Sequence, residues 1–126
     1  MKPVLHSLAA LCLAHACLLF PAHAQETGAD KTEAALASVT QLARINGVAL
    51  ACQDMPAASR AKKLMLAHAP KTQRFGSAFE EATHGSYLTQ TSGSAACPDS
   101  AALSAQLDTV AVQLQRTLPI NTAPAQ

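Results

Sequence analysis

The chain has none of the short motifs that assign an enzyme or a metalloprotein from sequence. It contains no Cys-x-x-Cys, so thioredoxin-like redox chemistry and zinc-ribbon ligation lack their spacing, and no Cys-x-x-Cys-His for covalent haem attachment. A His-Glu-x-x-His zinc motif and a glycine-rich phosphate loop are also missing, and no Ser/His/Asp order stands out. We therefore expect a protein that is not an enzyme.

Net charge and strand character are also low. The formal net charge is +1 at pH 7, so no overall field attracts nucleic acid or an anionic membrane. No segment alternates apolar and polar residues, β-branched clusters are few, and alanine is abundant throughout. These features favour a helical protein and exclude nucleic acid as an expected partner.

The first 24 residues have the order of a secretory signal peptide. A short positive start at Met1-Lys2 is followed by an apolar run and by the small-x-small site Ala22-His23-Ala24. Cleavage there makes Gln25 the first mature residue and leaves one domain without a stable membrane anchor. Cys17 does not fit a lipidation site, because a histidine precedes it and the apolar run continues past it. We expect a periplasmic or secreted protein.

Export makes the two remaining cysteines, Cys52 and Cys97, candidates for a disulfide. Cys52 falls at the end of the first expected helix and Cys97 at the start of the last one. A disulfide brings the two Cα atoms within about 7 Å of each other. An up-down-up-down arrangement of four helices places these two ends together, whereas three helices would place them apart.

Apolar periodicity and capping residues predict four helices. Asp30, with Glu33 three positions on, resembles a capping box for the first of them. The expected helices cover residues 32–52, Asp54–Pro56 to His68, Thr72 or Ser77 to about Gln90, and Cys97–Ser100 to the residue before Pro119. The predicted fold class is all-α, a small up-down-up-down four-helix bundle crosslinked by one disulfide. Its divisions are a signal peptide (1–24), a polar tail (25–31), a helical domain (32–118) and a tail (119–126).

Two of these helices carry a feature with two interpretations. Asn46-Gly47 lies inside the first helix, where it either breaks the helix or lets a neighbouring helix approach closely. Phe75, Phe79 and Tyr87 form one stripe on the third helix. That stripe is either core or an exposed groove for a peptide or lipid. We expect core, because large apolar residues are scarce elsewhere.

One stretch of the chain is locally basic. Every charge between Asp54 and Glu80 is positive. The stretch is either a solvated helix face or a surface that binds a partner. The candidate partner-binding residues are Arg60, Lys63, Lys71 and Arg74.

A second candidate site combines thioether and imidazole groups. Met65 and His68 share a helix face, and Met55 is near them in sequence. These ligand types suit copper in an exported protein. The alternative is structural, since Met fills gaps in cores and a cationic His68 suits a helix end.

The function we expect from the sequence is binding of another protein in the periplasm, as a chaperone, an inhibitor or an accessory of an envelope complex. In size and cysteine separation alone, the chain is similar to the periplasmic acid-stress chaperones. The alternative function is a periplasmic copper-binding protein that uses Met55, Met65 and His68. No other cofactor is expected.

Overall fold

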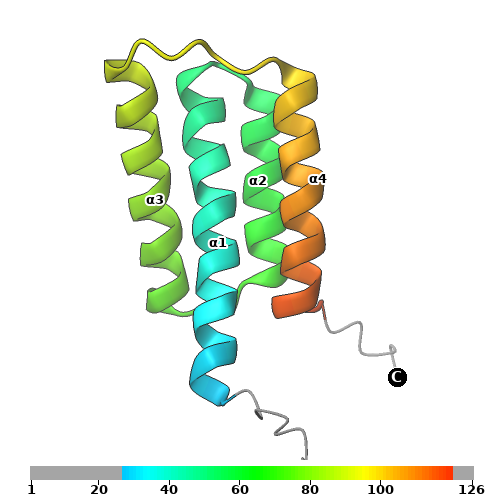
Figure 1. Ribbon diagram of the computed structural model, residues 1–126. Coiled ribbons are helices and arrows are strands. Elements are labelled where there is room, and N and C mark those ends of the chain that lie inside the picture. The colour runs from blue at the N-terminus through cyan, green and yellow to red at the C-terminus, as the bar shows by residue number, and fades with distance from the viewer. Residues whose placement is uncertain (1–26, 121–126) are drawn as a thin grey trace, which may run out of the picture.

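The computed structural model describes residues 27–120 as four helices joined by short connections (Figure 1). They are α1 (Gly28–Ala51), α2 (Met55–His68), α3 (Gln73–Ser92) and α4 (Ser100–Thr117). Their directions alternate, so the prediction of an all-α, up-down-up-down bundle is confirmed. The predicted signal peptide lies outside the described residues.

The first helix begins four residues earlier than predicted. Thr27, not Asp30, is its N-cap, and the Thr27 hydroxyl accepts a hydrogen bond from the Asp30 backbone N–H. The Asp30 carboxylate accepts a bond from the Thr27 backbone N–H at 3.0 Å, which completes a capping box. Asp30 is therefore the third helical residue, and part of the expected polar tail forms the first turn.

Two of the other three helices begin with a capping carboxylate. The Asp54 carboxylate accepts a bond from the Ala57 N–H at 3.0 Å, with Pro56 in the first turn of α2. Asp99 caps α4 in the same way, through the Ala102 N–H at 2.7 Å. Of the two expected starts for α3, the earlier one is correct, with Thr72 in the N-cap position.

The hydrophobic core lies between α1, α2 and α4. On α4, four apolar residues that recur at a 4-3-4 spacing in the sequence are all fully buried: Leu103, Leu107, Val110 and Leu114. Val39 and Leu42 of α1 are also fully buried, and the buried residues of α2 are the small Ala57, Ala58 and Ala61, with Leu64 and Met65 packed half-buried against the core. Because burial of one leucine contributes roughly 1.5–3 kcal/mol, the α4 stripe is a main source of stability.

The four helices do not form a square. The central helix α1 packs against the other three, and α2 also packs against α4. Within the described chain, no Cα atom of α3 lies within 8 Å of a Cα atom of α2 or α4. Figure 1 shows α1 between α3 on one side and α4 on the other. Among the described helices, α3 therefore packs against α1 alone, and we call the α1–α3 interface the seam.

Gly47 makes this seam possible. Helix α1 is continuous through Asn46-Gly47, so the second interpretation of this pair is correct. A Cβ atom added at Gly47 would lie 2.3 Å from the Thr83 carbonyl oxygen and 2.9 Å from the Tyr87 backbone nitrogen. The backbone of α3 thus occupies the space that any larger residue would need.

The predicted disulfide is present between Cys52 and Cys97, whose Cα atoms are 5.7 Å apart. Cys52 follows the last residue of α1, and Cys97 lies in the segment that crosses the top of the bundle from α3 to α4 (Figure 1). The bond therefore fastens this crossing segment to the end of the central helix.

Candidate functional site

An open groove runs between α2 and α3, with α1 as its floor. Its volume is about 620 Å³. We call it the α2–α3 groove. It is lined by Asn46 and Leu50 of α1, by Lys62, Met65 and Leu66 of α2, and by Gly76, Phe79, Glu80, Thr83, His84 and Tyr87 of α3. The groove follows from the packing, because α2 and α3 each contact α1 and leave a space between them.

The walls of the α2–α3 groove carry apolar side chains that the bundle leaves accessible. Leu66 is 73% exposed and Tyr87 is 40% exposed, while Met65 and Phe79 are half-buried. Exposure of this degree leaves apolar area that a bound partner could remove from water.

The expectation that the aromatic stripe of α3 forms core is correct only for Phe75. Phe75 is buried, Phe79 packs half-buried against the core, and Tyr87 is exposed. The physical reason is the single seam: a helix that contacts one neighbour buries a narrow face, so the stripe ends outside it. The other interpretation of the stripe, an accessible groove, describes the Tyr87 end.

A buried polar contact lies on the groove floor. The Thr83 hydroxyl donates to the Ala43 carbonyl oxygen of α1 at 3.2 Å and accepts from the Asn46 side-chain amide at 3.2 Å. Asn46 is 1% exposed, and its Oδ1 atom has no hydrogen-bond donor among the described residues. The two hydrogen bonds that are made join α3 to α1 beside Gly47 in a definite geometry, and losing them would leave further polar groups unpaired in a low dielectric.

The two rims of the groove carry opposite charges. Lys62 lies on the α2 rim and Glu80 on the α3 rim, with His84 one turn beyond Glu80. Neither Lys62 nor Glu80 forms an ion pair with another described residue. Both charges are therefore available to a molecule that binds in the groove.

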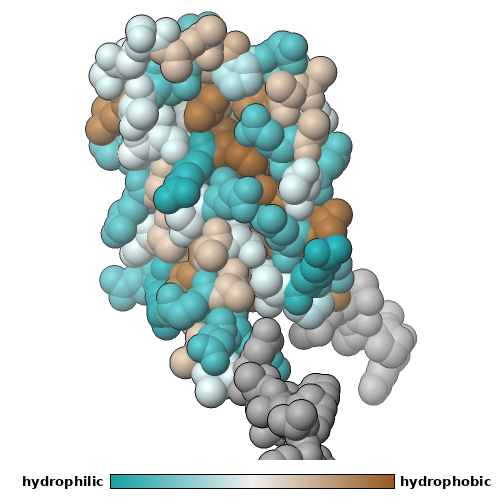
Figure 2. Space-filling model, in the orientation of Figure 1, coloured by the Kyte–Doolittle hydropathy of each residue, from teal (hydrophilic) through white to brown (hydrophobic). Residues whose placement is uncertain are grey.

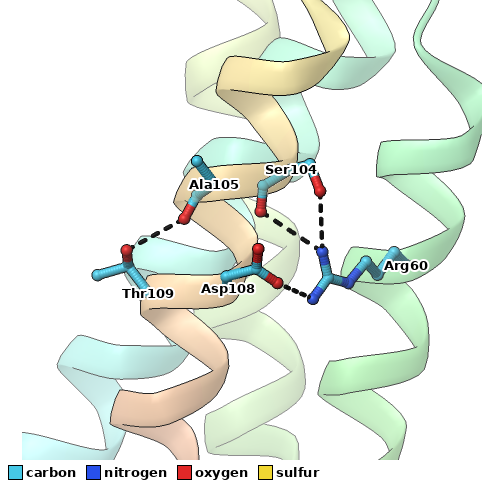
Figure 3. A network of polar contacts seen from close by, with 5 residues as sticks. All are labelled: Arg60, Ser104, Ala105, Asp108 and Thr109. Atoms are coloured by element: carbon cyan, nitrogen blue, oxygen red, sulfur yellow. Dashed lines mark hydrogen bonds and ion pairs between the residues drawn. The ribbon is translucent and has the colours of Figure 1, made fainter.

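Two of the four predicted partner-binding residues are engaged within the bundle. Arg60 reaches from α2 to the Asp108 carboxylate of α4 and to the Ser104 hydroxyl, the latter at 3.3 Å (Figure 3). Arg74 of α3 pairs with Glu33 of α1. The two arginines point to different neighbours, so they do not form one surface.

Lys63 and Lys71 are exposed and form no ion pair with a described residue. They remain candidates for partner binding, as predicted. The prediction omitted Lys62, which is the lysine that lines the groove. The sequence alone does not distinguish Lys62 from Lys63 as the groove residue, because the choice depends on which side of α2 faces α3.

The three candidate copper ligands are not brought together. Met55 begins α2 and is 57% exposed, whereas His68 ends it, about 20 Å away at the helical rise of 1.5 Å per residue. Met65 lines the groove, and the Nδ1 atom of His68 lies 2.7 Å from the Leu118 carbonyl oxygen beside α4. The described residues also hold no cluster of three His, Cys, Asp or Glu side chains suited to a metal ion.

Two helix-start carboxylates have lowered pKa values. A hydrogen bond from the Ala57 backbone N–H, with a smaller contribution from the Ser100 side chain, lowers the pKa of Asp54. Hydrogen bonds from the side chain and backbone of Thr27 lower the pKa of Asp30. In both cases the bonds favour the ionised carboxylate.

The central helix α1 is long and apolar enough to cross a membrane by length and composition. Half of its most apolar window is buried inside the bundle, as is typical of a core helix in a folded domain. The face in Figure 2, which carries α1 between α3 and α4, is mostly polar, with hydrophobic side chains in a broken band. These observations fit α1 as the core helix of the bundle.

Comparison with protein-family models, with curated proteins and with solved structures found no match for this chain. A function must therefore be inferred from the residues and geometry described above.

Proposed function

We propose that this is an exported, non-enzymatic helical protein that binds another protein of its compartment through the α2–α3 groove. Export is supported by the signal-like order of residues 1–24 and by the Cys52–Cys97 disulfide, which is typical of oxidising compartments. The groove is the proposed binding surface, and the predicted partner-binding residues Lys63 and Lys71 lie outside its lining.

The exposure of Leu66 is the observation that carries the proposal. This leucine is 73% exposed and lines an apolar groove together with Tyr87 and Phe79. A single exposed leucine is ordinary, but one that forms the wall of a groove adds to a continuous apolar surface. A partner that covers it gains roughly 25 cal/mol for each Å² of apolar area removed from water.

Site-specific photo-crosslinking tests the proposal. A photoactivatable residue at position 66 should crosslink the exported protein to one defined partner, whereas the same residue at position 112 should not. Val112 is the matched control, because it is 52% exposed and lies on α4, outside the groove. Leu66→Ser should weaken the captured complex by about tenfold or more, while Val112→Ser should leave it unchanged.

Two results would overturn the proposal. The first is equal crosslinking from positions 66 and 112, which would indicate nonspecific contact. The second is a partner that is captured equally well by Leu66→Ser and by the unaltered protein, which would place the binding surface elsewhere.

A further inference from the structure

We propose that the occupant of the α2–α3 groove is an amphipathic α-helix of the partner protein, a proposal that rests on the function proposed above. The helix lies along α3 with its apolar face on the groove floor. Its acidic side faces Lys62 and its basic side faces Glu80.

Backbone hydrogen bonding selects a helix over an extended segment. Both walls and the floor of the groove are α-helices, so their interior N–H and C=O groups are already paired within each helix. An extended segment buried there would find no backbone partners, since strand addition needs the free edge of a sheet. A helix arrives with its own backbone bonds made, which removes that cost.

The residues of α3 that line the groove have the spacing and the length needed to pack against another helix. Its lining residues recur at three- and four-residue intervals from Gly76 through Glu80 and Thr83 to Tyr87. This distance is about 16 Å, or three helical turns. Neighbouring helices pack at interaxial distances of about 8–10 Å, and α1 on the floor presents Asn46 and Leu50 to such a neighbour.

Gly76 offers a close approach on the groove side of α3. A Cβ atom added there would meet no atom within 4 Å, so no part of the bundle uses the space beside this glycine. Gly47 is an example of a helix glycine whose adjacent space is filled, because the backbone of α3 lies directly against it. A partner helix can approach Gly76 in the same way, within the apolar groove that α1, α2 and α3 already form.

Charge complementarity selects the direction in which the bound helix runs along the groove. Lys62 and Glu80 lie on opposite rims and have no ion-pair partner among the described residues. Once its apolar face lies on the floor, a helix with acidic residues on one flank and basic residues on the other pairs with both rims in only one chain direction. Rim pairs contribute little affinity, but they discriminate between orientations.

Synthetic peptides of about 14 residues, roughly four turns, test the proposal on the mature, disulfide-bonded protein. Each peptide has leucines at helical spacing, with glutamates on one flank and lysines on the other. The measurement is the dissociation constant by fluorescence anisotropy. A central proline should weaken binding by roughly a hundredfold, because a proline inside a helix costs about 3 kcal/mol.

Matched glycine variants locate the bound peptide. Gly76→Leu should abolish binding by filling the groove, whereas Gly85→Leu should not. Gly85 is the control because it also lies in α3 with open space beside it, but it faces a different cleft. Both replacements remove a helix-interior glycine, so neither should impair folding through loss of helix propensity.

Charge reversal tests this direction. Exchanging the flanks of the peptide should weaken binding by about threefold, and Lys62→Glu combined with Glu80→Lys should restore it.

The outcomes separate this proposal from the function it rests on. A proline peptide that binds as well as its parent, or no peptide binding at all, would overturn the helical occupant while crosslinking at position 66 still identified a partner. Crosslinking of position 66 to a second copy of this chain would overturn both. Binding that is lost in Gly85→Leu and kept in Gly76→Leu would place the peptide in another cleft and overturn the assignment to this groove.

Discussion

Two interfaces of the central helix contain different kinds of residue. Toward α4, the core contains large apolar side chains, including Leu42 of α1 and the buried leucine stripe of α4. Toward α3, the seam contains Ala43, Gly47 and the Asn46–Thr83 contact. The first interface gains stability from the apolar area that it buries. The second depends on close backbone approach and on hydrogen bonds of defined geometry.

The two interfaces should therefore respond in opposite ways when substitutions remove or add side-chain atoms. A core of large side chains loses most when atoms are removed, because a cavity remains. A seam closed around a glycine loses most when atoms are added, because the opposing backbone has to move. The attachment of α3 is therefore specific in position, and it leaves the outer faces of α3 free for other contacts.

The largest loss of stability should follow removal of the disulfide that fastens the crossing segment to the end of α1. Replacing Cys52 and Cys97 with serine removes a crosslink across 45 positions. Loop-closure entropy for that separation gives about 4 kcal/mol, and strain in either state can reduce the figure. Urea unfolding of the double variant measures the loss. A difference below about 1 kcal/mol would mean that the crossing segment stays in place without the bond.

A slightly smaller loss is expected from a cavity in the α4 interface. Leu107 is fully buried, so Leu107→Ala should lower the free energy of unfolding by about 3 kcal/mol. Gln106→Ala, at the exposed neighbouring position, is the control and should change it by less than about 0.5 kcal/mol. Equal effects of the two substitutions would contradict the division between the interfaces.

The seam should show the reverse behaviour. Gly47→Ala adds one methyl group against the α3 backbone and should destabilise the protein by about 1–3 kcal/mol, despite the helix propensity of alanine. Amide exchange should rise in α3 and stay low in α4. Gly85→Ala, with open space beside it, should stabilise by up to about 1 kcal/mol. A Gly47→Ala protein as stable as the original would mean that the seam is loose.

The smallest expected effect is on the loss of folding stability at low pH. The Ala57 and Ser100 hydrogen bonds lower the pKa of Asp54 below its ordinary value of 3.8, so its ionised form favours the folded state. That contribution is full above the ordinary pKa and is lost as the pH falls through the lower folded-state pKa. Asp54→Asn keeps a good N-cap but does not titrate there. The variant should lose less stability than the original between about pH 5 and pH 2, measured by urea midpoints. An equal loss in both proteins would assign the acid sensitivity to other groups.

Local signals in the sequence predicted the elements of this fold. The 4-3-4 stripe identified the buried face of α4, Asp54 and Asp99 marked helix starts, and one cysteine pair set the topology. These signals suffice because capping and helical periodicity involve residues only a few positions apart. The start of α1 was wrong by four residues, since Asp30 can serve either as a cap or as the third residue of a capping box.

The α2–α3 groove could not be predicted in the same way. Its position depends on α3 packing against α1 alone, and that preference comes from contacts between Gly47 and residues about forty positions away. The choice between Lys62 and Lys63 as the groove residue depends on that packing too. The distant contacts between helices leave no pattern within a single helix.

The disulfide also determines how the bundle carries force. The described chain enters and leaves at one end of the bundle, whereas Cys52 and Cys97 join α1 to the beginning of α4 near the other end (Figure 1). Tension applied between Gly28 and Thr117 therefore passes along α1, through the sulfur atoms and along α4. Helices α2 and α3 lie in the loop that the disulfide closes, so the covalent path of the load bypasses them. While the bond is oxidised, pulling on the two ends separates α1 from α4 from that end of the bundle upward, and the disulfide keeps the far ends of the two helices joined.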